Sequence, residues 1–207
     1  MADRMLRRYE DRDRMNHWFI ALMFVLAGLS GLAFFHPSLF FLTNLFGGGP
    51  WTRILHPVLG LLMVVAFAVL FVRLWRDNRI TDADRVWRKH MGALLRGDKA
   101  GLPPVGKYNY GQKLTFWAMA ASLVVLLVTG VMFWRPWFAG YFPVDLLRAA
   151  VLLHALSAVV LILATIVHVY AAIWVKGTVR AMTRGTVSEG WAKVNHPLWH
   201  REMTKER

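Results

Sequence analysis

Four histidines lie within long apolar stretches of this sequence: His17, His56, His154 and His168. Ionisable side chains are costly inside a membrane and usually have a function where they occur there. Such an imidazole can bind a metal, relay protons or hydrogen-bond a neighbouring helix. His154 and His168 are 14 residues apart, which is about 21 Å along an α-helix and an offset of only about 40° around it. One helix would therefore present two histidines on the same side at two depths.

The stretches around these histidines are long enough to cross a bilayer, which takes roughly 20 apolar residues. Of the 207 residues 57% are hydrophobic, and the mean hydropathy is +0.40. No Asp, Glu, Lys or Arg occurs in 15–52, 54–72, 114–134 or 149–175. We predict an all-α membrane protein, a four-transmembrane-helix bundle with spans at about 16–35, 54–75, 112–134 and 148–175.

The basic residues predict how these helices are oriented. Of the 25 Lys and Arg, 22 lie before the first span, in 73–113 or from Lys176 onward, and only Arg53, Arg135 and Arg148 lie in the other two connections. Basic residues are concentrated on the cytoplasmic side of membrane proteins. The prediction is a multi-pass protein of the inner membrane with both termini in the cytoplasm. The net charge of +13 then follows from this topology, and part of it would meet anionic lipid headgroups. We therefore expect no nucleic acid partner.

This orientation assigns each histidine a depth. His17 lies just past Arg14, near the cytoplasmic side, whereas His56 lies just past Arg53, near the outer side. The last span begins outside, so that His154 is outer and His168 is inner. The predicted pairs are therefore His56 with His154 and His17 with His168.

Two pairs of imidazoles at two depths favour haem. Zinc and copper sites usually need three or four neighbouring ligands, whereas haem iron can be held by two axial imidazoles. A proton relay would more often include carboxylates, and a hydrogen bond between helices remains the simplest alternative for one histidine alone. Gly28, Gly31 and Gly60 would leave room for a porphyrin, although glycine also aids helix packing. We predict two b-type haems, with the four histidines as iron ligands.

Polar neighbours of these sites are harder to interpret. Thr129, Ser157 and Thr165 are candidates for the second ring nitrogen of a ligand histidine, although bonding to the helix backbone is the commoner use of such residues. Arg135 would either pair with a haem propionate or anchor its helix at the interface. The chain has no cysteine, which excludes c-type haem attachment and thiolate-bound iron–sulfur clusters within it.

Outside the spans, the sequence shows no repeat, and we predict a single domain over 1–207, with a cytoplasmic loop 76–111 and a cytoplasmic tail 176–207. A short amphipathic helix is predicted at about Asp84–Leu95. Gly47-Gly48-Gly49-Pro50 predicts a turn. His36, His90, His196 and His200 lie outside the spans and are interpreted as surface or interfacial residues with no assigned role.

Several segments of the chain resemble the cytochrome b (gamma) subunit of respiratory, membrane-bound formate dehydrogenase, and together they cover nearly all of it. They are R-I-L-H-P (53–57), V-G-K-Y-N-Y-G-Q-K (105–113), T-G-V-M-F-W-R-P-W-F-A-G-Y-F-P (129–143), L-L-H-A (152–155), H-V-Y-A-A-I-W-V-K-G (168–177) and W-A-K-V-N-H-P-L-W-H-R-E (191–202). The resemblance implies the same histidine pairs, the outer haem on His56 and His154 and the inner haem on His17 and His168. It also implies a quinone site at Asn109, Gly111 and Gln112, which border His168; from the residues alone, Asn109 would mainly cap the next helix.

The resemblance also implies the reaction. A catalytic (alpha) subunit with molybdenum or tungsten oxidises formate on the outer side. An iron–sulfur (beta) subunit then passes electrons to the haems, and a quinone, menaquinone or ubiquinone, is reduced on the cytoplasmic side. This chain would be the electron-transferring part of that enzyme, with no catalytic residue for formate itself. The alternatives are the cytochrome b subunit of a nickel–iron hydrogenase or thiosulfate reductase, and a haem-free membrane anchor or transporter.

Overall fold

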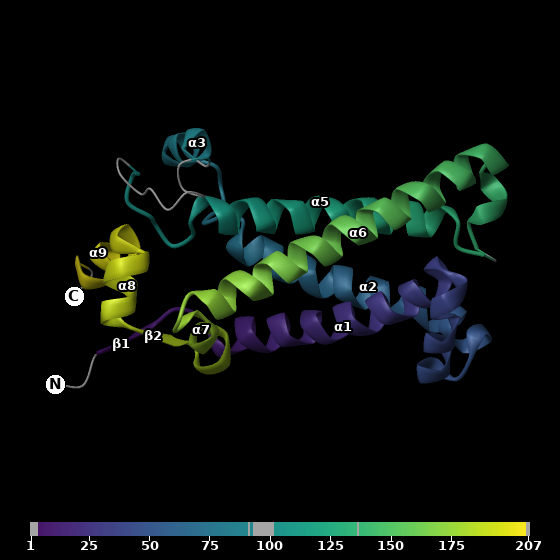
Figure 1. The fold of residues 1–207 in the computed structure, drawn as a ribbon, viewed down its shortest axis with the longest axis horizontal. Helices are drawn as coiled ribbons and strands as arrows, with labels where there is room; N and C mark the ends of the chain where they lie inside the picture. Colours follow the sequence, from purple (N-terminus) through teal and green to yellow (C-terminus); the bar gives the residue numbers. More distant parts are fainter. Residues whose placement is uncertain (1–3, 91, 93–101, 136, 206–207) are drawn as a thin grey trace. The chain divides into compact units, whose positions relative to one another are not determined.

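The computed structural model describes residues 4–90, 92, 102–135 and 137–205 (Figure 1). Its helices are α1 (Asp11–Phe35), η1 (Pro37–Phe46), α2 (Gly49–Leu74), α3 (Asp82–Lys89), α5 (Tyr110–Met132), η2 (Ala139–Tyr141), α6 (Val144–Trp174), α7 (Thr178–Arg184), α8 (Glu189–Asn195) and α9 (Pro197–Lys205), and its strands are β1 (Met5–Arg7) and β2 (Thr186–Ser188). The chain forms two compact units. The bundle unit comprises Met15–Val72 and Ala118–Val167, and the terminal unit comprises Met1–Arg14, Arg73–Trp117 and His168–Arg207. The prediction of a single domain stays a prediction.

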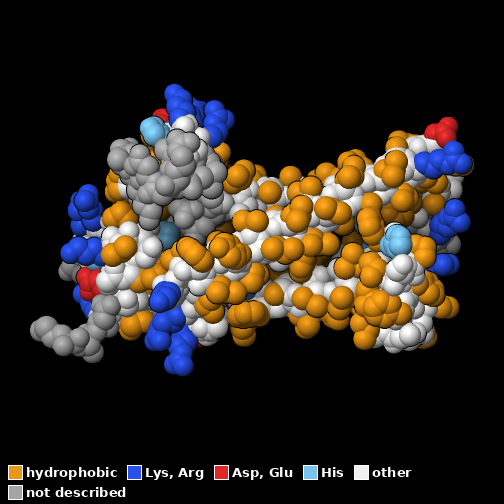
Figure 2. All heavy atoms as spheres, in the orientation of Figure 1, with side chains coloured by type: hydrophobic (Ala, Val, Ile, Leu, Met, Phe, Trp, Pro, Cys, Tyr) orange, Lys and Arg blue, Asp and Glu red, His pale blue; other side chains and the backbone are white. Residues whose placement is uncertain are grey.

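The four long helices α1, α2, α5 and α6 contain 23 to 31 residues each and are apolar enough to cross a membrane. Four spanning helices were predicted from the charge-free stretches, and the structure confirms them. Only 11% to 22% of each helix's most apolar window is buried, and Figure 2 shows hydrophobic side chains over the visible face of the long helices. An apolar surface of this extent suits a lipid environment, in which backbone polar groups must be bonded within the helix.

Within the bundle unit, all four long helices contribute to one buried cluster: Met23, Ala27, Met63, Leu123 and Leu161. Two of these side chains come from α1 and one from each of the other three helices. Small and flexible side chains allow helices to approach closely and to fill irregular gaps. The cluster holds the helices that carry His56 and His154.

The start of α2 differs from the sequence interpretation. The turn predicted at Gly47-Gly48-Gly49-Pro50 is present at its first two residues, where Gly47 and Gly48 adopt φ of 86° and 93°. Gly49 and Pro50 instead begin α2, because proline suits the first turn of a helix, where its missing N–H has no partner to lose. Further along, Pro57 lies inside α2 and cannot donate to the carbonyl of Arg53.

The terminal unit joins the two ends of the chain. Strand β1 pairs antiparallel with β2, with Leu6 opposite Val187, and both side chains enter a core with Ala181, Ala192 and Trp199. Gly185 links α7 to β2 with φ of 75°, and a Cβ there would lie 2.9 Å from the carbonyl oxygen of Tyr9. Glycine is therefore required at this crossing for both its conformation and its size.

The amphipathic helix predicted at Asp84–Leu95 is present as α3, which begins and ends earlier, at Asp82–Lys89. Thr81 begins it, and its backbone N–H and hydroxyl both donate to Asp84 Oδ2. Much of the remainder of the prediction lies at 91 and 93–101, outside the described residues.

Candidate functional site

His56 on α2 and His154 on α6 face one another in the bundle unit. Their ring centroids are 6.3 Å apart, with an angle of 67° between the ring planes. Two imidazoles bound to opposite sides of one iron, with metal–nitrogen bonds of about 2 Å, have centroids roughly 6 Å apart. The pair that was inferred from depth alone thus lies together at a separation that suits one metal between two rings.

Ser30 on α1 contacts the Nδ1 atom of His56. Its Oγ lies 2.9 Å from His56 Nδ1 and donates its single proton to the carbonyl of Ala27 at 3.0 Å. The hydroxyl can therefore only accept from the imidazole, so Nδ1 carries the ring proton. The lone pair of Nε2 is then free to bind a metal.

Thr129 on α5 has the same relation to His154. Its Oγ1 lies 2.9 Å from His154 Nδ1 and donates to the carbonyl of Val125 at 2.6 Å. Because the single hydroxyl proton is donated to Val125, Thr129 Oγ1 can only accept from the imidazole. The ring proton of His154 therefore lies on Nδ1 and the lone pair on Nε2. The ring of Phe133 meets His154 edge-on at 5.1 Å and restricts its rotation.

A glycine follows each hydroxyl residue and lies against the same histidine. A Cβ on Gly31 would lie 3.1 Å from His56 Cε1, and one on Gly130 would lie 3.2 Å from His154 Cε1. With alanine at either position, the ring would have to shift by a few tenths of an ångström. The site thus consists of two similar halves, Ser30-Gly31 with His56 and Thr129-Gly130 with His154.

The sequence interpretation found part of this arrangement. Thr129 was one of three candidate partners, whereas Thr165 donates to the carbonyl of Leu161. Gly28, Gly31 and Gly60 were expected to leave room for a porphyrin. A Cβ on Gly28 or Gly60 would meet no atom within 4 Å, whereas one on Gly31 would meet the His56 ring, and the expectation stays a prediction. Ser30 and Gly130 were missed. The signal that could have identified them is the small hydroxyl–glycine step, which occurs 26 residues before His56 and 25 before His154.

His17 and His168 fall in different units. His17 lies on α1 in the bundle unit, where its ring meets that of Trp18 edge-on at 5.4 Å. His168 is exposed and lies on α6, in the part that belongs to the terminal unit. The pairing of His17 with His168 stays a prediction.

The predicted quinone-site residues form the beginning of α5. The backbone N–H of Gln112 donates to Asn109 Oδ1, and the backbone N–H of Asn109 donates to Gln112 Oε1, both at 2.9 Å. This reciprocal cap confirms the helix-entry role expected for Asn109. It uses the two carbonyl oxygens, so the side-chain NH₂ groups are the donors that a quinone oxygen would use. Gly111 between them is exposed.

Arg135, also in the bundle unit, is exposed. With Ala139, Gly140 and Leu147 it lines a small cavity of about 250 Å³. Both interpretations of its role, a propionate partner and an interfacial anchor, remain open.

The histidines outside the spans have structural contacts. His36 Nδ1 accepts from the backbone N–H of Ser38, and His90 Nδ1 lies 2.9 Å from the carbonyl of Val86. His200 pairs with Glu189 at 3.1 Å. His196 was interpreted as a surface or interfacial residue, and this was wrong: it is only 2% exposed, because it packs against Arg8 and Trp191 and its Nδ1 lies 2.8 Å from the carbonyl oxygen of Gly106.

The family to which the chain belongs follows from comparison with known proteins. The profile of the prokaryotic cytochrome b561 family matches residues 8–185. The chain belongs to this family. A cytochrome b carries haem b, so membership implies this cofactor for an integral membrane protein. Within the described residues, no group of three or more His, Cys, Asp and Glu side chains could hold a metal ion, whereas the two-imidazole site of His56 and His154 fits haem iron.

Several curated proteins are similar to this chain over nearly its whole length. The formate dehydrogenase cytochrome b556(fdo) subunit of Escherichia coli K12 is 44% identical over 198 residues, 96% of this chain and 93% of the relative. The nitrate-inducible cytochrome b556(Fdn) subunit of the same strain is 43% identical over 202 residues, covering 98% and 93%. The formate dehydrogenase cytochrome b556 subunit of Haemophilus influenzae is 39% identical over 200 residues, covering 97% and 84%. The resemblance to cytochrome b subunits of formate dehydrogenase is confirmed.

Proposed function

We propose that this chain is the membrane cytochrome b subunit of a formate dehydrogenase, and that it carries electrons from the subunits that oxidise formate to a quinone. The 39% to 44% identity to formate dehydrogenase cytochrome b556 subunits supports the choice of complex. The single observation that supports electron transfer by this chain is the facing pair His56 and His154, 6.3 Å apart.

His56 and His154 would hold the outer of two b-type haems. Bound haem b supplies one-electron chemistry. The chain's own contribution is to keep the Nε2 lone pairs of His56 and His154 available to the haem iron, because the hydroxyls of Ser30 and Thr129 hold the ring protons on Nδ1. Because Gly31 and Gly130 have no side chain, the two rings can stay at these hydroxyls. The apolar helices around the pair exclude water and thereby strengthen the electrostatic effect of every nearby dipole.

His17 and His168 would hold the inner haem, in keeping with the 14-residue spacing of His154 and His168 on one helix. The quinone, menaquinone or ubiquinone, would bind near the beginning of α5. There the side-chain NH₂ groups of Asn109 and Gln112 would donate to a quinone oxygen, and the exposed Gly111 would let the ring approach the backbone. Protons for quinol formation would come from the nearby aqueous phase.

The distribution of 22 of the 25 Lys and Arg residues supports an orientation with both termini in the cytoplasm of a bacterial inner membrane. Formate oxidation would then occur on the periplasmic side, in an alpha subunit with molybdenum or tungsten, and an iron–sulfur beta subunit would deliver the electrons. Electron movement across the membrane, with proton uptake from the cytoplasm, would contribute to the proton-motive force.

The test is the composition and the spectrum of the purified complex. We expect a molybdenum or tungsten subunit, an iron–sulfur subunit, two haem b per copy of this chain and a b-type α band that formate reduces. A nickel–iron subunit in place of the molybdenum or tungsten one would assign the chain to a hydrogenase. Absence of b-type absorption from an intact complex would support a haem-free anchor instead and contradict the proposal.

A further inference from the structure

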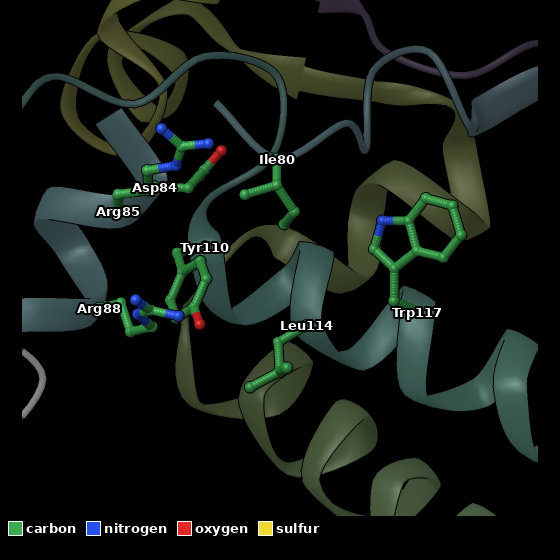
Figure 3. Close-up of a pocket in the computed structure, with 7 residues that line it drawn as sticks. All are labelled: Ile80, Asp84, Arg85, Arg88, Tyr110, Leu114 and Trp117. Carbon is green, nitrogen blue, oxygen red and sulfur yellow. The ribbon is translucent and has the colours of Figure 1, made fainter. Parts of the chain in front are cut away.

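The terminal unit contains a cavity of about 250 Å³ between α3 and the first turns of α5. Ile80, Asp84, Arg85, Arg88, Tyr110, Leu114 and Trp117 line it, and Figure 3 shows their arrangement. None of the three predicted quinone residues is among these lining residues. At 100° per residue, Tyr110, Leu114 and Trp117 lie within about 60° of one another on α5, while Gln112 lies about 160° from Tyr110.

One wall of this cavity is apolar. Ile80 and Leu114 are about half exposed, and the indole of Trp117 is held in place because its Nε1 donates to the carbonyl of Asn78 at 2.9 Å. From Leu114 and Trp117, α5 continues into its apolar, membrane-spanning part. Tryptophan is enriched at the level of lipid headgroups, so this wall lies where the hydrocarbon region of a bilayer begins.

The acidic residue of the cavity is already neutralised. Asp84 Oδ2 accepts from Lys113 Nζ at 2.6 Å as well as from the N–H and hydroxyl of Thr81. Burial alone would raise the pKa of Asp84, but these hydrogen bonds outweigh it and hold the pKa below its usual value. Asp84 and Lys113 are both buried and together contribute no net charge. The net charge of the cavity lining therefore comes from Arg85 and Arg88.

Arg85 and Arg88 lie one turn apart on α3 and are both exposed. Arg85 pairs with Asp82 at 2.8 Å, but both side chains are more than two-thirds exposed, and such surface pairs are weak and exchange readily. In Figure 3 the guanidinium of Arg88 points towards the hydroxyl of Tyr110, whereas that of Arg85 extends away from both, on the Asp84 side of the cavity. Two guanidiniums and a phenol can each donate hydrogen bonds to a phosphate.

We propose that this cavity binds the phosphate of an anionic phospholipid, with one acyl chain along Leu114 and Trp117. Basic pockets at the end of membrane helices recognise such headgroups by charge and by the adjoining apolar surface. Charge complementarity selects an anionic lipid over a zwitterionic one, and the apolar wall selects a lipid over free phosphate. The lipid would hold α3 against the beginning of α5.

The test uses the intact, purified complex, stripped of lipid in detergent and titrated with dioleoylphosphatidylglycerol, with bound lipid counted by native mass spectrometry. The double variant Arg85→Gln/Arg88→Gln should bind this lipid at least about tenfold more weakly, because a hydrogen bond between charged groups contributes roughly a factor of ten or more. The matched control is Arg180→Gln/Arg184→Gln. It removes the same charge from exposed positions on α7 of the same unit and should bind as the parent does.

Leu114→Trp provides a second variant, which fills the cavity without changing its charge and should also weaken binding. Haem content reports whether each variant has assembled. Equal affinity of the double variant and its control would overturn the proposal, as would equal binding of dioleoylphosphatidylcholine. If inorganic phosphate displaces the lipid mole for mole, the site binds free phosphate and the lipid assignment is wrong.

Discussion

The hydroxyl of Thr129 is the most informative single group to remove from the proposed outer haem site. Thr129→Val keeps the shape of the side chain and deletes the oxygen that lies 2.9 Å from His154 Nδ1. The Nδ1–H of His154 then loses this oxygen, while the hydrogen bond between His154 and the backbone of Leu126 remains. One such hydrogen bond contributes about 1 kcal/mol, and loss of a hydrogen bond to a metal-binding histidine typically lowers metal affinity 10- to 100-fold.

The hydrogen bond also makes His154 a more basic ligand, because an acceptor at Nδ1–H increases the electron density at Nε2. A more basic ligand stabilises ferric iron over ferrous iron, so its loss should raise the haem midpoint potential. If about 1 kcal/mol of the interaction distinguishes the two oxidation states, the shift is roughly 40 mV for a one-electron couple. We expect one haem to shift by tens of millivolts while the other stays constant.

The assay is a spectroelectrochemical titration of the purified complex, with haem counted by pyridine haemochrome. Thr165→Val is the matched control, because the Thr165 hydroxyl bonds the carbonyl of Leu161 on its own helix, as Thr129 bonds that of Val125. Thr129→Ser should restore the parent potential. An unchanged potential and haem content in Thr129→Val would refute the hydrogen-bonding role, and equal shifts in both valine variants would show a general packing effect.

Three further predictions concern the inner haem and the terminal unit. His168→Ala should remove the inner haem and quinone reduction while the outer haem remains, counted by pyridine haemochrome; loss of both haems or of neither would contradict the pairing. Arg8 is 7% exposed, lies 4.8 to 5.8 Å from the ring centroids of four aromatic side chains and donates to the carbonyl of Lys107 at 2.5 Å, so Arg8→Ala should destabilise the terminal unit by about 3 kcal/mol. Hydrogen exchange at β1 and β2 would measure it, with the exposed Arg12→Ala as control, and equal exchange in both variants would contradict it. Burial and the charge of Arg8 lower the pKa of His196 to about 4. The unfolded chain therefore binds the proton first as pH falls below 6.5, and stability is lost progressively from there towards pH 4, by about 2 kcal/mol at pH 5. Hydrogen exchange of α8 and α9 across this range should show the loss, and His196→Asn should flatten it; an equally steep profile in that variant would assign the effect to another group.

The sequence alone was sufficient for the four spanning helices and for the meeting of His56 with His154. Both inferences rest on properties of the linear sequence. Lack of charge over about 20 residues is enough to predict a span, and the regular rise of an α-helix converts residue number into depth. Charge asymmetry between the connections added the orientation on which the proposed inner pair of His17 and His168 still rests.

The tertiary structure decided which side chains face one another at a given depth. Depth does not specify the rotation of neighbouring helices, so Ser30 and Gly130 could not be selected from the other small residues of α1 and α5. The space beside Gly28 and Gly60 is open, with no atom within 4 Å of a built Cβ, whereas that beside Gly31 is taken by the His56 ring. The hydroxyl partners of the two histidines, and with them the proton positions that direct Nε2 inward, become visible only when helices distant in sequence pack together.

Contacts between residues distant in sequence also explain why His196 in the terminal unit was misinterpreted. His196 looked like a surface residue because the polar tail around it shows no apolar periodicity, yet it is buried against Arg8, 188 residues away, with 3.4 Å between Arg8 Nη2 and His196 Nε2. The cavity between α3 and α5 likewise depends on Asp84 meeting Lys113 across a loop. Local sequence was enough to predict the helices and the cytochrome b family, whereas long-range packing decided the partners of each polar group, because hydrogen bonds require a particular distance and direction that helical periodicity alone does not specify.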